Sequence, residues 1–214
     1  MRNGAIIPSV RGADGGAARQ IAIALALGFL TLEALRLYLQ DVSHLARDYV
    51  EPAWGRLWPN RFWAMLHIAG ATLALFSGPF QLWSGLRDRH RTIHRWTGRV
   101  YVSGVFVGGA AAFYLSAFAE PRSLGVALFS LGVAWWFTVG MAFRAIKQHR
   151  IEAHMEWMIR GYVVTYSFVT FRLWIGSPIW STFDSSRLAV VLWLAWVAPL
   201  LLTEVCLRAL HHER

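Results

Sequence analysis

The chain has 214 residues, of which 56% are hydrophobic and 15% charged, and its mean hydropathy is +0.40. This composition excludes an ordinary soluble domain and predicts an integral membrane protein. The net charge of +9 does not indicate nucleic-acid binding, because the basic residues stand beside apolar runs, where they set topology and contact membrane lipids. The single cysteine, Cys206, excludes an intrachain disulfide, a cysteine zinc site and a c-type haem.

Six apolar runs, each long enough to cross the bilayer as a helix, follow a Gly-rich polar tail at residues 1–16. We expect the tail to be disordered and residues 17–210 to form one all-α integral membrane domain, a six-transmembrane helix bundle. The expected spans are residues 17–39, 62–83, 96–118, 124–146, 157–174 and 188–210. The first is expected to be a signal anchor, because it lacks a small-residue cleavage site before the polar segment that follows.

Small residues mark the second and third runs as closely packed helices. His67, Ala71, Ala74 and Gly78 share one helical face of the second run. This stripe is typical of close helix packing, with the floor of a cofactor slot as the alternative. The third run contains Gly104-x-x-x-Gly108, which predicts a tightly packing face.

Six spans put both termini on one side of the membrane, and the basic residues indicate which side. Most of the 21 Lys and Arg residues fall on the side of the amino terminus, with the largest groups at residues 87–99 and 144–160. Because cytoplasmic loops are enriched in Lys and Arg, we expect both termini to be cytoplasmic.

Two histidines are expected at the same depth near the cytoplasmic surface. His94 and His154 directly precede the third and fifth runs, which both lead away from the cytoplasm, so their rings can face each other. Two imidazoles on alternate helices are the ligand pair of a bis-histidine haem. The pattern therefore predicts haem b between His94 and His154, with Arg95, Arg99 and Arg160 as cations for its propionates or for lipid headgroups.

Two other interpretations of these histidines stay open. The ligands of an alternative non-haem metal site are His90, His94, His149 and His154, with Asp88, Glu152 or Glu156 as carboxylate ligands. In the third interpretation no cofactor is bound, and the histidines hydrogen-bond lipid headgroups or backbone carbonyls.

Other ionisable residues also lie inside apolar runs. An intramembrane histidine is a functional hypothesis by default, and the fourth run has no histidine to pair with His67. We therefore expect His67 to hydrogen-bond a quinone, to act as a single ligand or to make a polar packing contact. Arg172 is expected to form a structural ion pair with an acid of the outer loops. Glu33 and Arg36, three residues apart near the end of the first run, are expected either to pair with each other or to extend to the membrane interface.

Four short motifs carry a resemblance to a known family. They are His67-x-x-Gly70, Gly78-Pro-Phe-Gln81, His94-Arg-x-x-Gly-Arg-x-Tyr101 and His154-x-x-Trp-Met-x-Arg160. Together they resemble the bacterial predicted membrane proteins grouped as domain-of-unknown-function family 2306, over about residues 60–175. The resemblance implies a multi-helix fold in the bacterial cytoplasmic (inner) membrane and no particular reaction. The signature positions that it implies are His67, His94, Arg99, His154 and Arg160.

A weaker similarity, limited to the pair His94 and His154, is to the transmembrane cytochrome b ferric reductases. Together these observations predict a membrane b-type cytochrome or redox subunit that carries electrons between a quinone or another reductant and an acceptor. The alternative is a non-catalytic accessory subunit of a larger respiratory or photosynthetic membrane complex.

Overall fold

The structure is a computed structural model, and it describes residues 31–36, 39, 55–82, 89–175 and 187–212. The chain divides into two units, Met1–Val42 and Ser43–Arg214. In the first unit residues 31–36 are helical, and the Arg36 guanidinium lies 2.8 Å from the Glu33 carboxylate, which confirms the predicted ion pair. The predicted tail and most of the first predicted span lie outside the described residues.

The described part of the second unit consists of helices and the short turns between them, and it contains no strand, which confirms the all-α class. Its elements are the 3-10 helix η2 (Gly55–Asn60) and the α-helices α3 (Arg61–Leu82), α5 (Arg91–Ser116), α6 (Arg122–Lys147), α7 (Ile151–Thr165), α8 (Ser167–Ile175) and α9 (Leu188–His212). Among the described residues, four segments are long and apolar enough to cross a membrane: Trp58–Leu82, Arg91–Ser116, Arg122–Lys147 and Leu188–Ala209. These four coincide with the second, third, fourth and sixth predicted spans.

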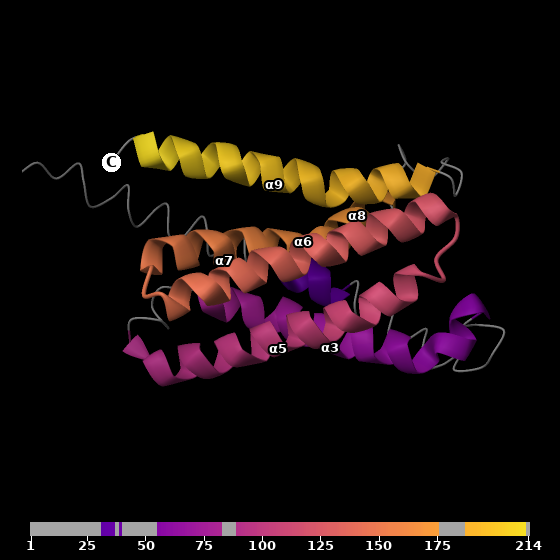
Figure 1. Ribbon diagram of the computed structural model, residues 1–214, viewed down its shortest axis with the longest axis horizontal. Coiled ribbons are helices and arrows are strands. Elements are labelled where there is room, and N and C mark those ends of the chain that lie inside the picture. Colours follow the sequence, from indigo (N-terminus) through magenta and orange to yellow (C-terminus); the bar gives the residue numbers. More distant parts are fainter. Residues whose placement is uncertain (1–30, 37–38, 40–54, 83–88, 176–186, 213–214) are drawn as a thin grey trace, which may run out of the picture. The chain divides into compact units, whose positions relative to one another are not determined.

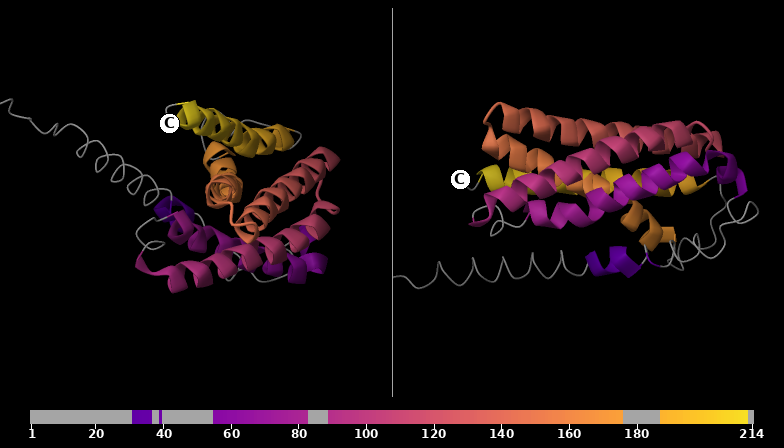
Figure 2. Two further views of the ribbon diagram at one scale, coloured as in Figure 1. Left: turned by 60° about the vertical axis from the view of Figure 1, so that its left-hand side comes forward. Right: turned by 90° about the horizontal axis from the view of Figure 1, so that it is seen from below.

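The fifth predicted span is divided at Tyr166 into α7 and α8, and α8 runs at a steep angle to the long helices (Figure 2). Threonine hydroxyls bond back along the helix on both sides of the division. Thr165 donates to the Gly161 carbonyl at 2.8 Å, and Thr170 donates to the Tyr166 carbonyl at 3.2 Å. Such bonds often bend helices, although the same kind of bond, from Thr138 to the Ala134 carbonyl, lies inside the undivided helix α6.

The helices of the second unit pack as two antiparallel pairs with α9 laid against one of them (Figure 1). One pair is α3 with α5, the other is α6 with α7, and α5 joins the two by packing on α6. Helix α9 contacts α6, α7 and α8. Because the connections are short, the amino ends of α5 and α7 lie at the same end of the bundle (Figure 1).

The backbones of α3 and α5 touch where the two glycine patterns meet. A methyl group on Gly70 would lie 2.6 Å from the Gly108 nitrogen and 2.7 Å from the Gly104 carbonyl oxygen. Ala74 of the same stripe is fully buried. The predicted tight packing of Gly104-x-x-x-Gly108 is therefore confirmed, and the partner is the small-residue stripe of α3.

A tyrosine of α7 completes the hydrogen bonding of α3 at its proline. Pro79 lies inside α3 and has no N–H to donate to the Leu75 carbonyl, one turn earlier. The Tyr162 hydroxyl donates to this carbonyl instead, at 3.2 Å, and the Tyr162 ring fills the space beside Gly78. The sequence Gly78-Pro79 is thus a docking point for α7.

Tyr162→Phe is expected to lower the free energy of unfolding by about 1 kcal/mol, because a buried carbonyl loses its donor. The thermal unfolding midpoint in detergent or nanodiscs measures the effect. Tyr114→Phe is the matched control, since its hydroxyl also donates at 3.2 Å, to Asn60, but from an exposed side chain. Equal shifts for the two variants would show that the Leu75 carbonyl does not depend on Tyr162.

Candidate functional site

Helices α5, α6 and α7 meet at the hydroxyl of Thr165. This hydroxyl accepts a hydrogen bond from Trp135 Nε1 at 2.8 Å and lies 3.0 Å from the Tyr101 hydroxyl. Since its only hydrogen is donated to the Gly161 carbonyl, the Tyr101 hydroxyl must be the donor of the bond between them. Tyr101 is fully buried, so the contact fixes the register of α5 against α7 inside the bundle.

His94 and His154 occupy equivalent places on the two helices. Each is the fourth residue of its helix, α5 or α7. Tyr101 and Gly161 follow seven residues later, about 10 Å along the helix axis, and a methyl group on Gly161 would lie 3.5 Å from the Tyr101 hydroxyl. Because seven residues return to nearly the same helix face, the histidines lie on the faces that meet at this contact, two turns nearer the amino ends.

The ring of His154 is oriented by α6. Its Nδ1 atom lies 2.9 Å from the Ala142 carbonyl oxygen. A carbonyl oxygen only accepts, so Nδ1 carries the hydrogen and the lone pair of the neutral ring is on Nε2. Histidines that bind metals are held in this way, with the second nitrogen bonded to a carbonyl or carboxylate.

The segment around His94 is held by α3. The Gln81 side-chain nitrogen donates to the Thr97 hydroxyl at 2.5 Å and to the His94 carbonyl at 3.2 Å. A methyl group on Gly98 would lie 2.9 Å from the Gln81 side-chain oxygen. The motif residues Gln81 and Gly98 therefore position the first turns of α5, and with them the half-buried His94.

The other predicted metal ligands lie on the surface. His90 caps the start of α5 without a side-chain capping bond, and His149 sits in the turn between α6 and α7 with a φ of 58°. Both side chains are exposed. Within the described part of the chain, no three His, Cys, Asp or Glu side chains lie close enough together to hold a metal ion. Asp88, a predicted carboxylate ligand, is outside that part.

His67 is the seventh residue of α3 and lies toward the end of the bundle opposite to His94 and His154. Its Nδ1 atom is 2.9 Å from the Gly108 carbonyl oxygen, and its ring centroid is 6.3 Å from that of Phe168 in α8. As in His154, bonding to a carbonyl puts the hydrogen on Nδ1 and the lone pair on Nε2. His67 thus strengthens the contact between α3 and α5, and its role toward a quinone stays a prediction.

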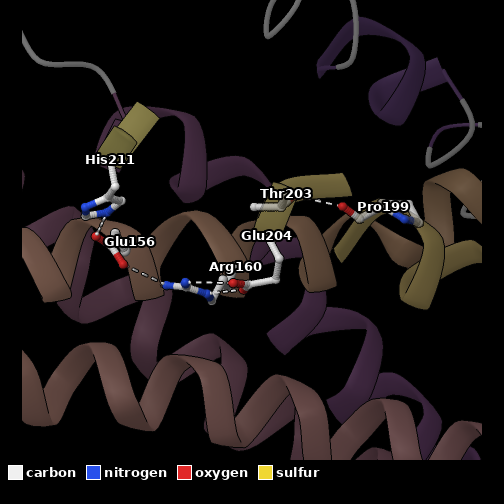
Figure 3. A network of polar contacts seen from close by, with 6 residues as sticks. All are labelled: Glu156, Arg160, Pro199, Thr203, Glu204 and His211. Carbon is white, nitrogen blue, oxygen red and sulfur yellow. Dashed lines mark hydrogen bonds and ion pairs between the residues drawn. The ribbon is translucent and has the colours of Figure 1, made fainter. Parts of the chain in front are cut away.

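A charged network joins α7 to α9 (Figure 3). The Arg160 guanidinium binds both carboxylate oxygens of Glu204, with Nε–Oε1 at 2.5 Å and Nη2–Oε2 at 3.1 Å. It also lies 3.3 Å from Glu156, whose other oxygen is 2.7 Å from His211 Nε2. The guanidinium carbon lies 4.8 Å from the centre of the Trp157 ring. Arg160 therefore has two carboxylate partners, and its predicted role beside a cofactor stays a prediction.

Glu204 is the site residue that the sequence motifs do not reveal. It lies 44 residues from Arg160, on a helix outside the four motifs. The signal that points to it is its position as an acid inside an apolar span, where an ionisable group needs a partner. The side chain of Arg172 is exposed on α8. Its proposed partners in the outer loops lie outside the described residues.

Long apolar helices, packed through glycine contacts and tied by inter-helix polar bonds, define a helical membrane protein. The family described as "Predicted membrane protein (DUF2306)" matches residues 64–207, and the chain belongs to this family. The match confirms the resemblance of the four motifs and extends it into α9, where Glu204 lies. No curated protein and no solved structure matches the chain. The similarity to ferric reductases stays a prediction.

Proposed function

We propose that this protein is a b-type cytochrome or redox subunit of the bacterial cytoplasmic membrane, with six spans and both termini in the cytoplasm. His94 and His154 would be the axial ligands of one haem. The observation that carries the proposal is their equivalent position, each fourth in its helix, on faces that meet at Tyr101 and Gly161. Haem would supply reversible one-electron transfer between a reductant and an acceptor.

The residues present fit such a group. His154 donates its Nδ1 hydrogen to Ala142, which leaves Nε2 as the ligand atom and fixes the ring. At the level of Tyr101, one tyrosine side chain reaches from α5 to α7, where its hydroxyl lies 3.0 Å from that of Thr165, and the space beside Gly161 is shared with Val139 of α6.

The proposed roles of the cations differ with their surroundings. Arg160 is bonded to Glu204 and Glu156, so its charge is already balanced. Arg95 and Arg99 are exposed beside His94, so they would be available to bind propionates or lipid headgroups. At the other end of the bundle, the Nε2 lone pair of His67 would accept a hydrogen bond from the hydroxyl of a reduced quinone.

An absorption spectrum of the purified protein, with haem and metal analysis, tests the proposal. We expect a Soret band that is lost in His94→Ala and in His154→Ala. The controls are His90→Asn and His149→Asn, which should keep the band. Asparagine is chosen because it tolerates the positive φ of His149.

The other outcomes separate the alternatives. A colourless protein with a bound metal ion that is lost in His149→Asn would support the non-haem site at His90, His94, His149 and His154. A colourless, metal-free protein would reject both cofactor proposals.

A non-catalytic accessory subunit is the second candidate function. Helix α9 presents large exposed apolar side chains, Val190, Leu194, Leu201, Leu202 and Val205. Such a face suits contact with a neighbouring membrane protein as well as with lipid. Co-purification of the chain with a respiratory or photosynthetic complex, at a fixed ratio and without a cofactor of its own, would favour this function.

A further inference from the structure

Three arginines follow one another along α5 at intervals of one helical turn. Arg91, Arg95 and Arg99, here called the arginine ladder, extend over about 12 Å of the helix. All three side chains are exposed. None of them forms a hydrogen bond or ion pair with another described residue, whereas Arg36 and Arg160 are both paired with carboxylates. The ladder is therefore a row of positive charge without a balancing anion in the described part of the chain.

The ladder descends from the amino end of α5 into a segment able to cross a membrane. Arg99 is stacked on Trp96, with its guanidinium carbon 4.8 Å from the ring centre, and Trp96 is 60% exposed. An exposed Trp is typical of the headgroup region. A cation beside hydrocarbon must reach the interface or bind an anion, because an unpaired charge is costly there.

Beyond the ladder, the same face of α5 becomes apolar. Phe106 and Ala110 follow Arg95 and Arg99 at helical spacing, and both are exposed. The Phe106 ring is braced by Trp136 of α6, with the ring centroids 5.2 Å apart. This face therefore presents guanidinium groups with an interfacial Trp among them, and beyond them an apolar surface, so that polar and apolar parts follow each other as in a phospholipid.

We propose that the arginine ladder binds the phosphate of an anionic phospholipid, whose acyl chains lie along the Phe106 face of α5. Arginine suits this ligand because its planar guanidinium forms paired hydrogen bonds to phosphate oxygens. The net negative charge of the lipid offsets part of the positive charge of the row, whereas a zwitterionic lipid brings no net charge. This inference goes beyond the proposed redox function and does not depend on haem, and it assigns Arg95 and Arg99 to lipid.

Native mass spectrometry of the full chain with added phosphatidylglycerol tests the site. The variant is Arg95→Gln with Arg99→Gln, for which we expect about tenfold weaker retention of phosphatidylglycerol than in the wild type. The matched control is Arg144→Gln with Lys147→Gln, which removes two exposed charges from α6 at the same end of the bundle. The control should retain phosphatidylglycerol as the wild type does. Phosphatidylcholine should be retained weakly by all three proteins.

Three results would overturn the proposal. Equal losses of phosphatidylglycerol retention in both double variants would mean that lipid binding depends only on the total surface charge. Displacement of the lipid by millimolar inorganic phosphate would mean that the ladder binds free phosphate. A wild-type Soret band that disappears from the Arg95→Gln, Arg99→Gln variant, with phosphatidylglycerol still bound, would assign the arginines to haem propionates.

Discussion

Gly70→Ala is expected to destabilise the bundle by about 3 kcal/mol or more, although it adds a single methyl group. The new carbon would lie 2.6 to 2.7 Å from backbone atoms of Gly104 and Gly108. A side chain can rotate away from such a contact, but a backbone cannot, so α3 and α5 would have to separate. Their separation would also lengthen the 2.9 Å bond between His67 and the Gly108 carbonyl. Within a membrane, close packing of this kind is a main source of helix association.

The thermal midpoint of the purified protein measures this effect, and Gly140→Ala is the matched control. Gly140 is also inside a long helix, α6, but a methyl group there would have no neighbour within 4 Å. Alanine is a better helix former than glycine by about 0.5 to 1 kcal/mol, so the thermal midpoint of the control should stay at the wild-type value or rise. If both variants melted at the wild-type temperature, the backbone contact between α3 and α5 would be refuted.

The tightly packing faces of α3 and α5 could be predicted from the sequence because small residues at helical spacing have few other uses, but the sequence did not predict that these two faces meet. Gly104-x-x-x-Gly108 and the stripe from His67 to Gly78 each mark one face. The register that places Gly70 against Gly104 and Gly108 could not be predicted from the sequence, because a shift of one helix by one turn satisfies the same patterns. Register depends on contacts between distant residues, such as the bond between His67 Nδ1 and the Gly108 carbonyl oxygen.

Part of the candidate site could likewise be predicted from the sequence, and part could not. The sequence predicts equal depth for His94 and His154 because each precedes a run that leads away from the same side, and in the structure each is the fourth residue of a helix that begins at the same end of the bundle. The orientation of His154 could not be predicted, because it depends on the Ala142 carbonyl of another helix. The division of the fifth predicted span at Tyr166 could not be predicted either, because the neighbouring Thr165 hydroxyl is positioned by partners on α5 and α6.

Glu204→Ala is expected to lower the free energy of unfolding by about 2 kcal/mol and to loosen α9. The variant removes both bonds of the Arg160–Glu204 pair and leaves Arg160 with the longer contact to Glu156, at 3.3 Å. The Arg160 side chain is 13% exposed, and breaking a buried pair has a larger effect than breaking a surface pair. The Glu204 side chain is 35% exposed, so we place the effect below the range for fully buried pairs.

A label on Cys206, the only cysteine, separates loosening of α9 from general destabilisation. Cys206 is exposed on α9 two residues beyond Glu204, so a spin label there should become more mobile in Glu204→Ala at temperatures where the protein is folded. Arg160→Lys should give an intermediate change, because an ammonium group cannot match both carboxylate oxygens. Glu33→Ala breaks an exposed pair on another helix and should change neither the midpoint nor the label. A label equally mobile in all four proteins would show that the pair does not hold α9 against α7.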